Sequence, residues 1–138
     1  VSGRLIRVGF INTGVPHVVI FVDRIADIDV AGIGRSIRYH KKFAPGGTNV
    51  NFVETKGPNL IRIRTYERGV EAETLSCGTG GTASALIFAL KNNLEDLVKV
   101  QTESGETLKV YFQRDNLKFH NLWLEGSAKI VYKGEYYV

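Results

Sequence analysis

Cys77, the only cysteine in the chain, is the residue whose type and setting most directly indicate chemistry. It stands directly before Gly78, Thr79, Gly80 and Gly81, and an apolar segment follows. Small residues at a helix start leave backbone N–H groups open, and the positive end of the helix dipole attracts an anion such as a carboxylate or phosphate. The same field favours the thiolate form of a cysteine. We therefore predict an active-site corner whose thiol is an acid/base or a nucleophile.

The helix that must position this corner is predicted between the glycines and Lys91, where Asn92 and Asn93 suit a helix C-terminus. Apolar residues recur at helical spacing on one face, and the opposite face is equally apolar. The first face carries Ala83, Leu86, Ile87 and Leu90, and the second carries Ala85, Phe88 and Ala89. Such a helix is expected to be buried on all sides.

Three other interpretations of the glycine-rich corner compete with this one. A P-loop is excluded because no Lys-Ser or Lys-Thr follows the glycines. Gly78, Gly80 and Ala83 satisfy a dinucleotide-binding G-x-G-x-x-A pattern, but residues 71–76 do not predict a buried parallel strand and residues 98–102 alternate apolar and polar. An inert cysteine beside glycines that only turn the chain is the third alternative. It is disfavoured because an inert cysteine needs no glycine-rich helix start.

Length and composition predict one soluble globular domain: 138 residues, of which 43% are hydrophobic and 23% are charged. A single cysteine forms no internal disulfide, which fits the reducing cytoplasm. No apolar run is long enough to cross a bilayer and no leader is recognisable, so neither a membrane partner nor secretion is expected. The net charge of +4 is spread among acids, so no nucleic-acid partner is expected either.

The start of the chain is unusual. The sequence contains no methionine, and it runs from Val1-Ser2-Gly3 straight into a predicted strand. These features are typical of a fragment or a processed piece.

The first predicted strands cover residues 5–11 and 18–22, and residues 12–17 connect them as a turn. His17 therefore falls at the start of a buried strand. From the residues alone, the commoner explanation is a core histidine that is hydrogen-bonded to backbone.

Residues 29–39 predict an amphipathic helix that packs through Val30 and Ile37, with Ile33 beside them, and turns Arg35 and Arg38 to water. A turn at residues 44–47 then leads into a strand over residues 48–54.

Asn49 and Asn51 lie on one side of that strand. Two amides on one face can fix polar atoms of a substrate. Exposed asparagine at a strand edge is the commoner explanation.

The remaining pattern predicts further strands joined by short turns, over residues 60–66, 98–102, 107–112, 117–125 and 128–132. In the first of these, Ile61, Ile63 and Thr65 alternate with Arg62, Arg64 and Tyr66, as in a strand with one solvent-exposed face. Many antiparallel strands with few helices predict an α+β domain, in which a curved, mostly antiparallel sheet or barrel wraps a central apolar helix.

Four motifs then carry a family resemblance: TGVPH at residues 13–17, GTNVNF at 47–52, ERG at 67–69 and ETLSCGTG at 73–80. In this order they resemble the C-terminal half of a diaminopimelate epimerase, a racemase that works without pyridoxal phosphate. YKGE at residues 132–135 is similar to the family's last strand. The resemblance covers nearly the whole chain.

The resemblance implies an organisation in two domains that face each other across a substrate cleft. Residues 1–128 would form the C-terminal type of epimerase domain, and residues 129–138 would be a terminal strand in the sheet of an N-terminal domain. The implied partners are the N-terminal half of the same enzyme, which carries the second thiol, and a small-molecule substrate. Whether the protein is also a homodimer stays open.

The implied activity is conversion of LL-diaminopimelate to meso-diaminopimelate in lysine and cell-wall precursor biosynthesis, with no cofactor. By resemblance, Cys77 is one of two bases, His17 and Glu67 lie near the amino group and the reacting carbon, and Asn49 with Arg68 recognises the distal carboxylate. Such an inversion removes an α-proton from one face and returns a proton to the other. One cysteine cannot do both, so the chain alone is expected to be inactive.

Two further details concern the carboxylate site and position 15. The backbone amides of Gly78 and Thr79 are expected to hold the α-carboxylate and stabilise the charge that develops there. Many family members carry Asn where this chain has Val15, so a side-chain contact from that position is absent here.

Other functions remain open beside this one. Proline racemases share the cysteine-glycine-threonine corner but lack the ERG motif, and isomerases of the same fold without the cysteine pair are disfavoured by Cys77. A non-catalytic module that keeps the anion pocket is the alternative from another class. In that case alkylation of Cys77 would leave ligand binding intact.

Overall fold

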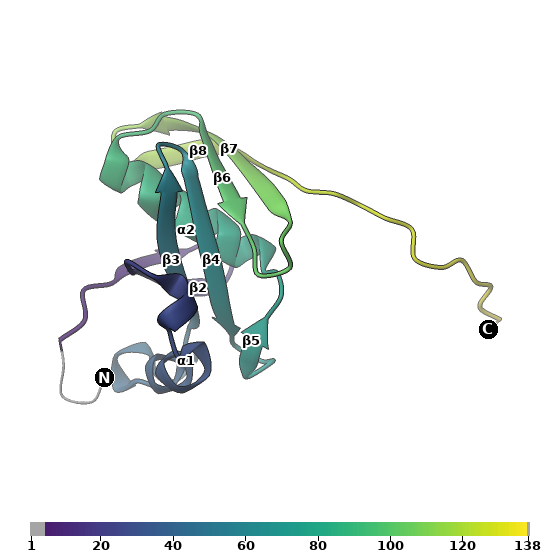
Figure 1. Cartoon of the computed structure of the whole chain (residues 1–138), viewed down its shortest axis with the longest axis horizontal. Coiled ribbons are helices and arrows are strands. Elements are labelled where there is room, and N and C mark those ends of the chain that lie inside the picture. Colours follow the sequence, from purple (N-terminus) through teal and green to yellow (C-terminus); the bar gives the residue numbers. More distant parts are fainter. Residues whose placement is uncertain (1–4, 138) are drawn as a thin grey trace.

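The computed structural model describes residues 5–137, which fold into one curled sheet and two α-helices (Figure 1). The strands lie in the order β1 (Gly9–Asn12), β2 (Pro16–Phe21), β3 (Asn49–Gly57), β4 (Leu60–Glu67), β6 (Leu97–Gln101), β7 (Thr107–Asp115) and β8 (Lys118–Glu125), and β5 (Ala72–Thr74) pairs with β4. The helices are α1 (Val30–Arg38) and α2 (Gly78–Asn92), with short 3₁₀ turns at Ile25–Asp27 and Lys41–Phe43.

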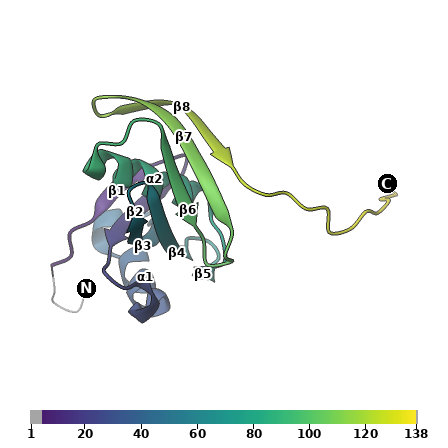
Figure 2. The ribbon, with the colours of Figure 1, turned by 45° about the horizontal axis from the view of Figure 1, so that its top comes forward.

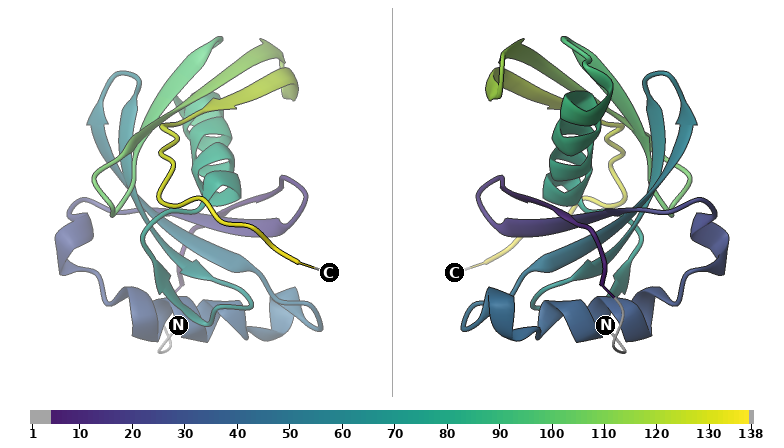
Figure 3. Two further views of the ribbon diagram at one scale, coloured as in Figure 1. Left: turned by 90° about the vertical axis from the view of Figure 1, so that its right-hand side faces the viewer. Right: turned by 90° about the vertical axis from the view of Figure 1, so that its left-hand side faces the viewer.

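The sheet is mostly antiparallel, as predicted. Only β2 with β3 and β4 with β6 pair in parallel. The sheet curls around α2, which lies on its concave side (Figures 2 and 3). The predicted α+β fold with a central apolar helix is therefore confirmed.

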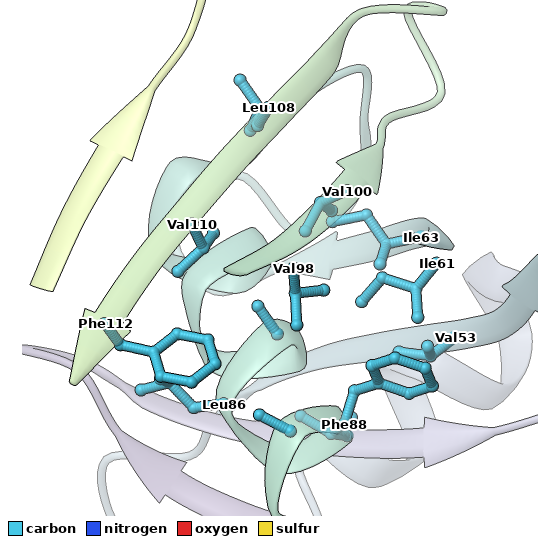
Figure 4. Close-up of a cluster of buried hydrophobic side chains, with 14 residues drawn as sticks. Val53, Ile61, Ile63, Leu86, Phe88, Val98, Val100, Leu108, Val110 and Phe112 are labelled. Atoms are coloured by element: carbon cyan, nitrogen blue, oxygen red, sulfur yellow. The ribbon is translucent and has the colours of Figure 1, made fainter. Parts of the chain in front are cut away.

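The main hydrophobic core lies between α2 and the concave face of the sheet (Figure 4). Leu86 and Phe88 of α2 share it with Ile61 of β4, Val98 of β6 and Val110 of β7. Burial of each such side chain contributes about 1.5–3 kcal/mol. The three alanines of this core, Ala83, Ala85 and Ala89, are fully buried. This core fixes the direction in which the start of α2 points.

The predicted burial of α2 on all sides is only partly correct, because Ile87 and Leu90 are half-buried. The reason is that the sheet does not close. Its outer strands β1 and β8 are not paired with each other, and Ile87 and Leu90 line an open cavity beside Gly9 of β1 and Phe21 of β2.

A second core lies on the convex face, under α1. Val18, Val50 and Phe52 point to this face, whereas Val19 and Val53 point to α2. The central strands are thus covered on both sides, which explains the continuous apolar run of β2 over residues 18–21.

Tyr66 corrects the pattern predicted for β4. We expected it on a solvent-exposed face, but it is 2% exposed and belongs to the core under α1. Its hydroxyl donates a hydrogen bond to the Glu71 backbone oxygen at 2.9 Å. The strand therefore has a second buried face at this end, because α1 packs there.

Helix α1 forms where the amphipathic pattern predicts it. The Asp29 side chain caps it by accepting from the Gly32 N–H at 2.9 Å. Arg35 is exposed, as expected, but Arg38 is not turned to water. Its guanidinium pairs with the Glu71 carboxylate at 3.0 Å, which ties α1 to the loop after β4.

Both ends of the described chain differ from the strand predictions. The first strand begins at Gly9, and the start of the chain at residues 1–4 lies outside the described residues. The strand expected at residues 128–132 does not form in this structure: residues 126–137 form no strand and extend away from the body (Figure 1). A lone segment has no neighbour here to complete its backbone hydrogen bonds. Within residues 5–137, neither helix has the length and hydrophobicity needed to cross a membrane.

Candidate active site

Cys77 is the N-cap of α2, with the extended backbone angles φ −138° and ψ 105°. Its Sγ accepts a hydrogen bond from the Gly80 N–H at 3.4 Å and lies 3.6 Å from the Thr79 hydroxyl oxygen. The first N–H groups of a helix have no intrahelical acceptor, so a side chain usually caps one of them. Here a thiol takes that place. The residue is 7% exposed, so the helix start shields its sulfur.

Two further N–H groups at this helix start are left over. The first α2 backbone bond runs from the Gly81 N–H to the Cys77 oxygen at 2.8 Å, and the Gly80 N–H is occupied by the thiol. The N–H groups of Gly78 and Thr79 have no acceptor within residues 5–137. Both are thus free to bind an anion next to Cys77.

An open cavity of about 420 Å³ lies over this corner. Its lining includes Cys77, Gly78, Thr79 and Glu67, together with Thr13, Ser76, Thr82 and Leu124. Its volume falls within the usual range for small-molecule sites. The structure therefore brings four of the predicted site residues together around one space.

Glu67 reaches this cavity from the last position of β4. Its Oε2 accepts a hydrogen bond from the Thr74 hydroxyl at 2.9 Å, across the β4–β5 pair. Thr13 closes the opposite side, where its hydroxyl donates to the Thr79 backbone oxygen at 3.3 Å. Short side-chain bonds between segments far apart in the sequence thus shape the cavity.

His17 is on β2 and is fully buried, and it does not line this cavity. Its Nδ1 lies 3.1 Å from the Asn51 Nδ2, and its Nε2 has no hydrogen-bond partner within the described residues. Burial, and secondarily the positive charge of Arg68, lowers the pKa of His17 to about 4. The imidazole is therefore neutral at pH 7.

Asn49 and Arg68 lie together, and neither lines the cavity. The Arg68 backbone N–H donates to the Asn49 Oδ1 at 2.7 Å, and the Asn49 Nδ2 donates to the Pro16 oxygen at 3.4 Å. One Arg68 guanidinium nitrogen donates to the Gly46 oxygen at 3.2 Å. Asn49 is 4% exposed, so the expectation of an exposed edge asparagine is wrong for it and for the fully buried Asn51.

The sequence did not assign a role to Thr65 or Leu124, and it gave Asn51 only as one of two amides that can bind a substrate. The hydroxyl of Thr65 donates to the Asn51 Oδ1 at 3.0 Å, deep between the strands and the helix start. The structure makes Asn51 a buried partner of neighbouring side chains instead. No local signal indicates Leu124, because β8 reaches the cavity only through the curl of the sheet.

A larger cavity of about 530 Å³ lies elsewhere, between β1, β2 and the end of α2. Arg7 and Lys91 lie beside Phe21 and Ile87 in its lining, which contains no acid, histidine or cysteine. The cavity at Cys77 is the one that combines a nucleophile, a carboxylate and open backbone donors.

Comparison with known proteins gives a consistent assignment. The family model described as diaminopimelate epimerase matches residues 9–131. A diaminopimelate epimerase from Aquifex aeolicus is 46% identical over 97% of this chain and 47% of its own length. One from Hydrogenobaculum sp. is 48% identical over 91% of this chain and 44% of its own length. The chain thus spans about half the length of these curated relatives.

Solved structures with much lower sequence identity share the fold. A predicted epimerase from Pseudomonas aeruginosa has a TM-score of 0.54 at 17% identity, over 72% of this chain and 33% of its own. A probable proline racemase from Agrobacterium radiobacter has a TM-score of 0.54 at 15% identity, over 86% of this chain and 40% of its own. The family model covers most of the chain and the fold agrees with it, so the chain belongs to the diaminopimelate epimerase family.

Proposed function

We propose that this chain is the C-terminal half of a diaminopimelate epimerase, an isomerase that converts LL-diaminopimelate to meso-diaminopimelate by two-base proton transfer. The relatives that carry this name support the proposal over nearly the whole chain. The observation that carries the chemistry is the thiol cap of α2 beside two open backbone N–H groups. The proposed setting is cytoplasmic biosynthesis of lysine and cell-wall precursors, without a cofactor.

The proton transfer uses the helix start as follows. The Cys77 thiolate takes the α-proton from one face of the substrate, and the electron pair of the broken C–H bond moves into the adjacent carboxylate. The N–H groups of Gly78 and Thr79 hold that carboxylate and stabilise the added charge. A thiol on the opposite face gives its proton to the carbon and becomes a thiolate. The configuration is inverted, and the two sulfurs have exchanged protonation states.

The other cavity residues suit a substrate that is an amino acid. The Glu67 carboxylate lies in the same cavity as the helix start, where it can accept hydrogen bonds from a substrate ammonium group. Arg68 presents a planar guanidinium, whose forked donors match a distal carboxylate. Asn49 supports Arg68 by accepting its backbone N–H, so we assign Asn49 to the distal site through that contact.

The second thiol belongs, in this proposal, to an N-terminal half that faces the cavity. Two observations support such a partner: the curated relatives are about twice as long as this chain, and residues 126–137 extend into solvent with apolar side chains. Ile130, Val131 and Tyr132 are between 74% and 81% exposed. We assign residues 1–128 to the domain and residues 129–138 to a strand that completes the partner's sheet.

The test measures exchange of the α-proton of LL-diaminopimelate in deuterated water by NMR, together with formation of the meso isomer. The chain is assayed alone, with a separately produced N-terminal half, and as the Cys77→Ala variant with that half. Exposed Ser36 on α1 provides a matched control as Ser36→Ala. Inversion is expected only for the mixture that keeps Cys77. Inversion at an unchanged rate by the Cys77→Ala mixture would refute the role of this thiol.

A further inference from the structure

The buried amide of Asn51 has an orientation that its partners fix. Its Nδ2 lies 3.0 Å from the Val18 backbone oxygen, and a carbonyl oxygen can only accept. The atom on that side must therefore be the amide nitrogen. The Oδ1 on the other side accepts from the Thr65 hydroxyl at 3.0 Å. The Thr65 hydroxyl can donate or accept, so the Val18 oxygen alone fixes the orientation: a flipped amide would place Oδ1 against that oxygen and lose a buried hydrogen bond.

This orientation determines where the proton of His17 lies. One hydrogen of the Asn51 Nδ2 goes to Val18, and the other faces the His17 Nδ1 at 3.1 Å. The Nδ1 must therefore present its lone pair. A neutral imidazole carries a single hydrogen, which in this ring is then on Nε2. Burial and Arg68 keep the pKa of His17 near 4, so this neutral form is the one present at pH 7.

The resulting Nε2–H group is a donor with nothing to donate to. Nε2 is buried and has no hydrogen-bond partner within residues 5–137. Buried polar groups in folded proteins are normally satisfied, and an exception calls for an explanation such as a functional role. The ring cannot rotate without losing its hydrogen bond to Asn51, so the direction of the Nε2–H group is fixed.

The same amide also packs against the turn that holds Cys77. A Cβ atom at Gly80 would collide with the Asn51 Oδ1, so the amide touches the helix at this residue. The Gly80 N–H is the group that binds the Cys77 sulfur. One side chain therefore contacts both the histidine and the cap of the catalytic helix.

We propose that Asn51 is a positioning residue that holds His17 as the Nε2–H tautomer, so that His17 serves the epimerase as a hydrogen-bond donor and not as a base. The catalytic part of this inference rests on the proposed function. The tautomer itself does not, because it follows from the contacts of Asn51 alone.

The first test needs no substitution at the site. Long-range ¹H–¹⁵N NMR of the ¹⁵N-labelled 138-residue chain at pH 7 distinguishes a protonated from an unprotonated ring nitrogen. His17 is identified with the variants His40→Gln and His120→Gln, which leave it as the remaining histidine. The expected result is an unprotonated Nδ1 and a protonated Nε2. A protonated Nδ1, or an equal mixture of tautomers, would overturn the proposal.

The second test changes the amide. Asn51→Asp replaces the donor by an acceptor, so the proton of His17 should move to Nδ1. Thr65→Val is the control, because it removes a bond to Oδ1 but leaves the donor that faces His17. The control should keep the wild-type tautomer. An Asn51→Asp chain that folds and still shows an unprotonated Nδ1 would contradict the role of Asn51.

The third test concerns catalysis, in the complex with the N-terminal half. Asn51→Ala should lower kcat roughly tenfold with a smaller change in KM, since the donor is misplaced while the carboxylate site stays. If Asn51→Ala leaves kcat unchanged while the wild-type chain shows the expected tautomer, the catalytic use of His17 is refuted. The proposed epimerase activity would not be affected by that result. Loss of inversion in the wild-type complex would instead count against the proposed function, whatever the tautomer.

Discussion

The cavity at the start of α2 and a buried cluster on the central strands, made of His17, Asn49, Asn51 and Thr65, use their polar groups in different ways. At the cavity, the N–H groups of Gly78 and Thr79 have no acceptor within the described chain. In the cluster, Asn49 and Asn51 bond through both ends of their amides. The cavity thus has open donors for a ligand, whereas nearly all donors and acceptors of the cluster form hydrogen bonds that connect the strands.

This difference separates the groups that a substrate can contact from the buried groups that position them. A substrate can reach Cys77 and Glu67, but His17 and Asn51 are fully buried. Substitutions at the cavity should therefore change activity more than stability, and substitutions in the cluster should change both. The Nε2 of His17 is an exception in the cluster, because it is buried and has no hydrogen-bond partner within residues 5–137.

The largest effect is expected at Cys77. Cys77→Ala removes the proton-transfer group and should lower kcat by at least about 10³-fold in the complete enzyme. Cys77→Ser should be nearly as damaging, because an alcohol is a far weaker acid than a thiol. Serine is nevertheless a good N-cap, so thermal unfolding of Cys77→Ser should change little. Near-normal turnover in either variant would remove Cys77 from the reaction.

Acid should destabilise the buried cluster through His17. Its pKa is about 4 in the folded chain, against 6.5 for a free histidine, so the unfolded chain binds more protons between these values. Stability should therefore fall as the pH drops from about 6.5 to 4, by roughly 3 kcal/mol. Urea unfolding as a function of pH measures this fall. His17→Gln should flatten it and His40→Gln should not; an equally steep fall in His17→Gln would assign it to other groups.

Two neighbouring glycines test the contact between the cluster and the cavity. A Cβ at Gly80 collides with the Asn51 amide, whereas a Cβ at Gly81 has its nearest neighbour, a Leu108 methyl, at 3.5 Å. Overpacking typically costs about 1–3 kcal/mol, and Gly→Ala within a helix otherwise stabilises by about 1 kcal/mol. Gly80→Ala should therefore be about 2 kcal/mol less stable than Gly81→Ala, which should be neutral or stabilised relative to the wild type. Equal unfolding midpoints for the two variants would disprove the contact.

The predictability of the two regions from sequence also differs. The glycine-rich helix start and its cysteine were predicted in place, because capping and helical periodicity are local properties of the chain. The double burial of β2 to β4 was not predicted, and Tyr66 was placed on the wrong face for that reason. The burial of Tyr66 depends on where α1 packs, and the residues next to Tyr66 in the sequence do not indicate that position.

The arrangement of the predicted site residues could not be derived from the sequence for a related reason. The resemblance implied one site containing His17, Asn49, Arg68 and Cys77, and in the structure His17 lies beside Asn51 and outside the cavity lining. The strand expected at residues 128–132 does not form here because apolar residues indicate a strand without providing the neighbour with which it pairs. Partners that are distant in the sequence, or on another chain segment, decide such features.

The smallest effect is expected at Arg68, where the cluster meets the proposed distal site. Arg68→Lys keeps the positive charge beside His17, so the stability profile of the cluster with pH should stay as in the wild type. Lysine lacks the planar fork that binds a carboxylate through two parallel hydrogen bonds. The KM for diaminopimelate should therefore rise roughly tenfold, equivalent to about 1.4 kcal/mol, with kcat nearly unchanged.

Arg62→Lys is the matched control, since Arg62 pairs with Glu103 at 3.2 Å and does not line the cavity. Steady-state kinetics of both variants in the complete enzyme make the comparison. A rise in KM for Arg68→Lys alone would show that the guanidinium geometry, and not the charge, binds the distal carboxylate. If the two variants have the same KM, the distal carboxylate is bound elsewhere, and Arg68 belongs to the holding cluster together with Asn49.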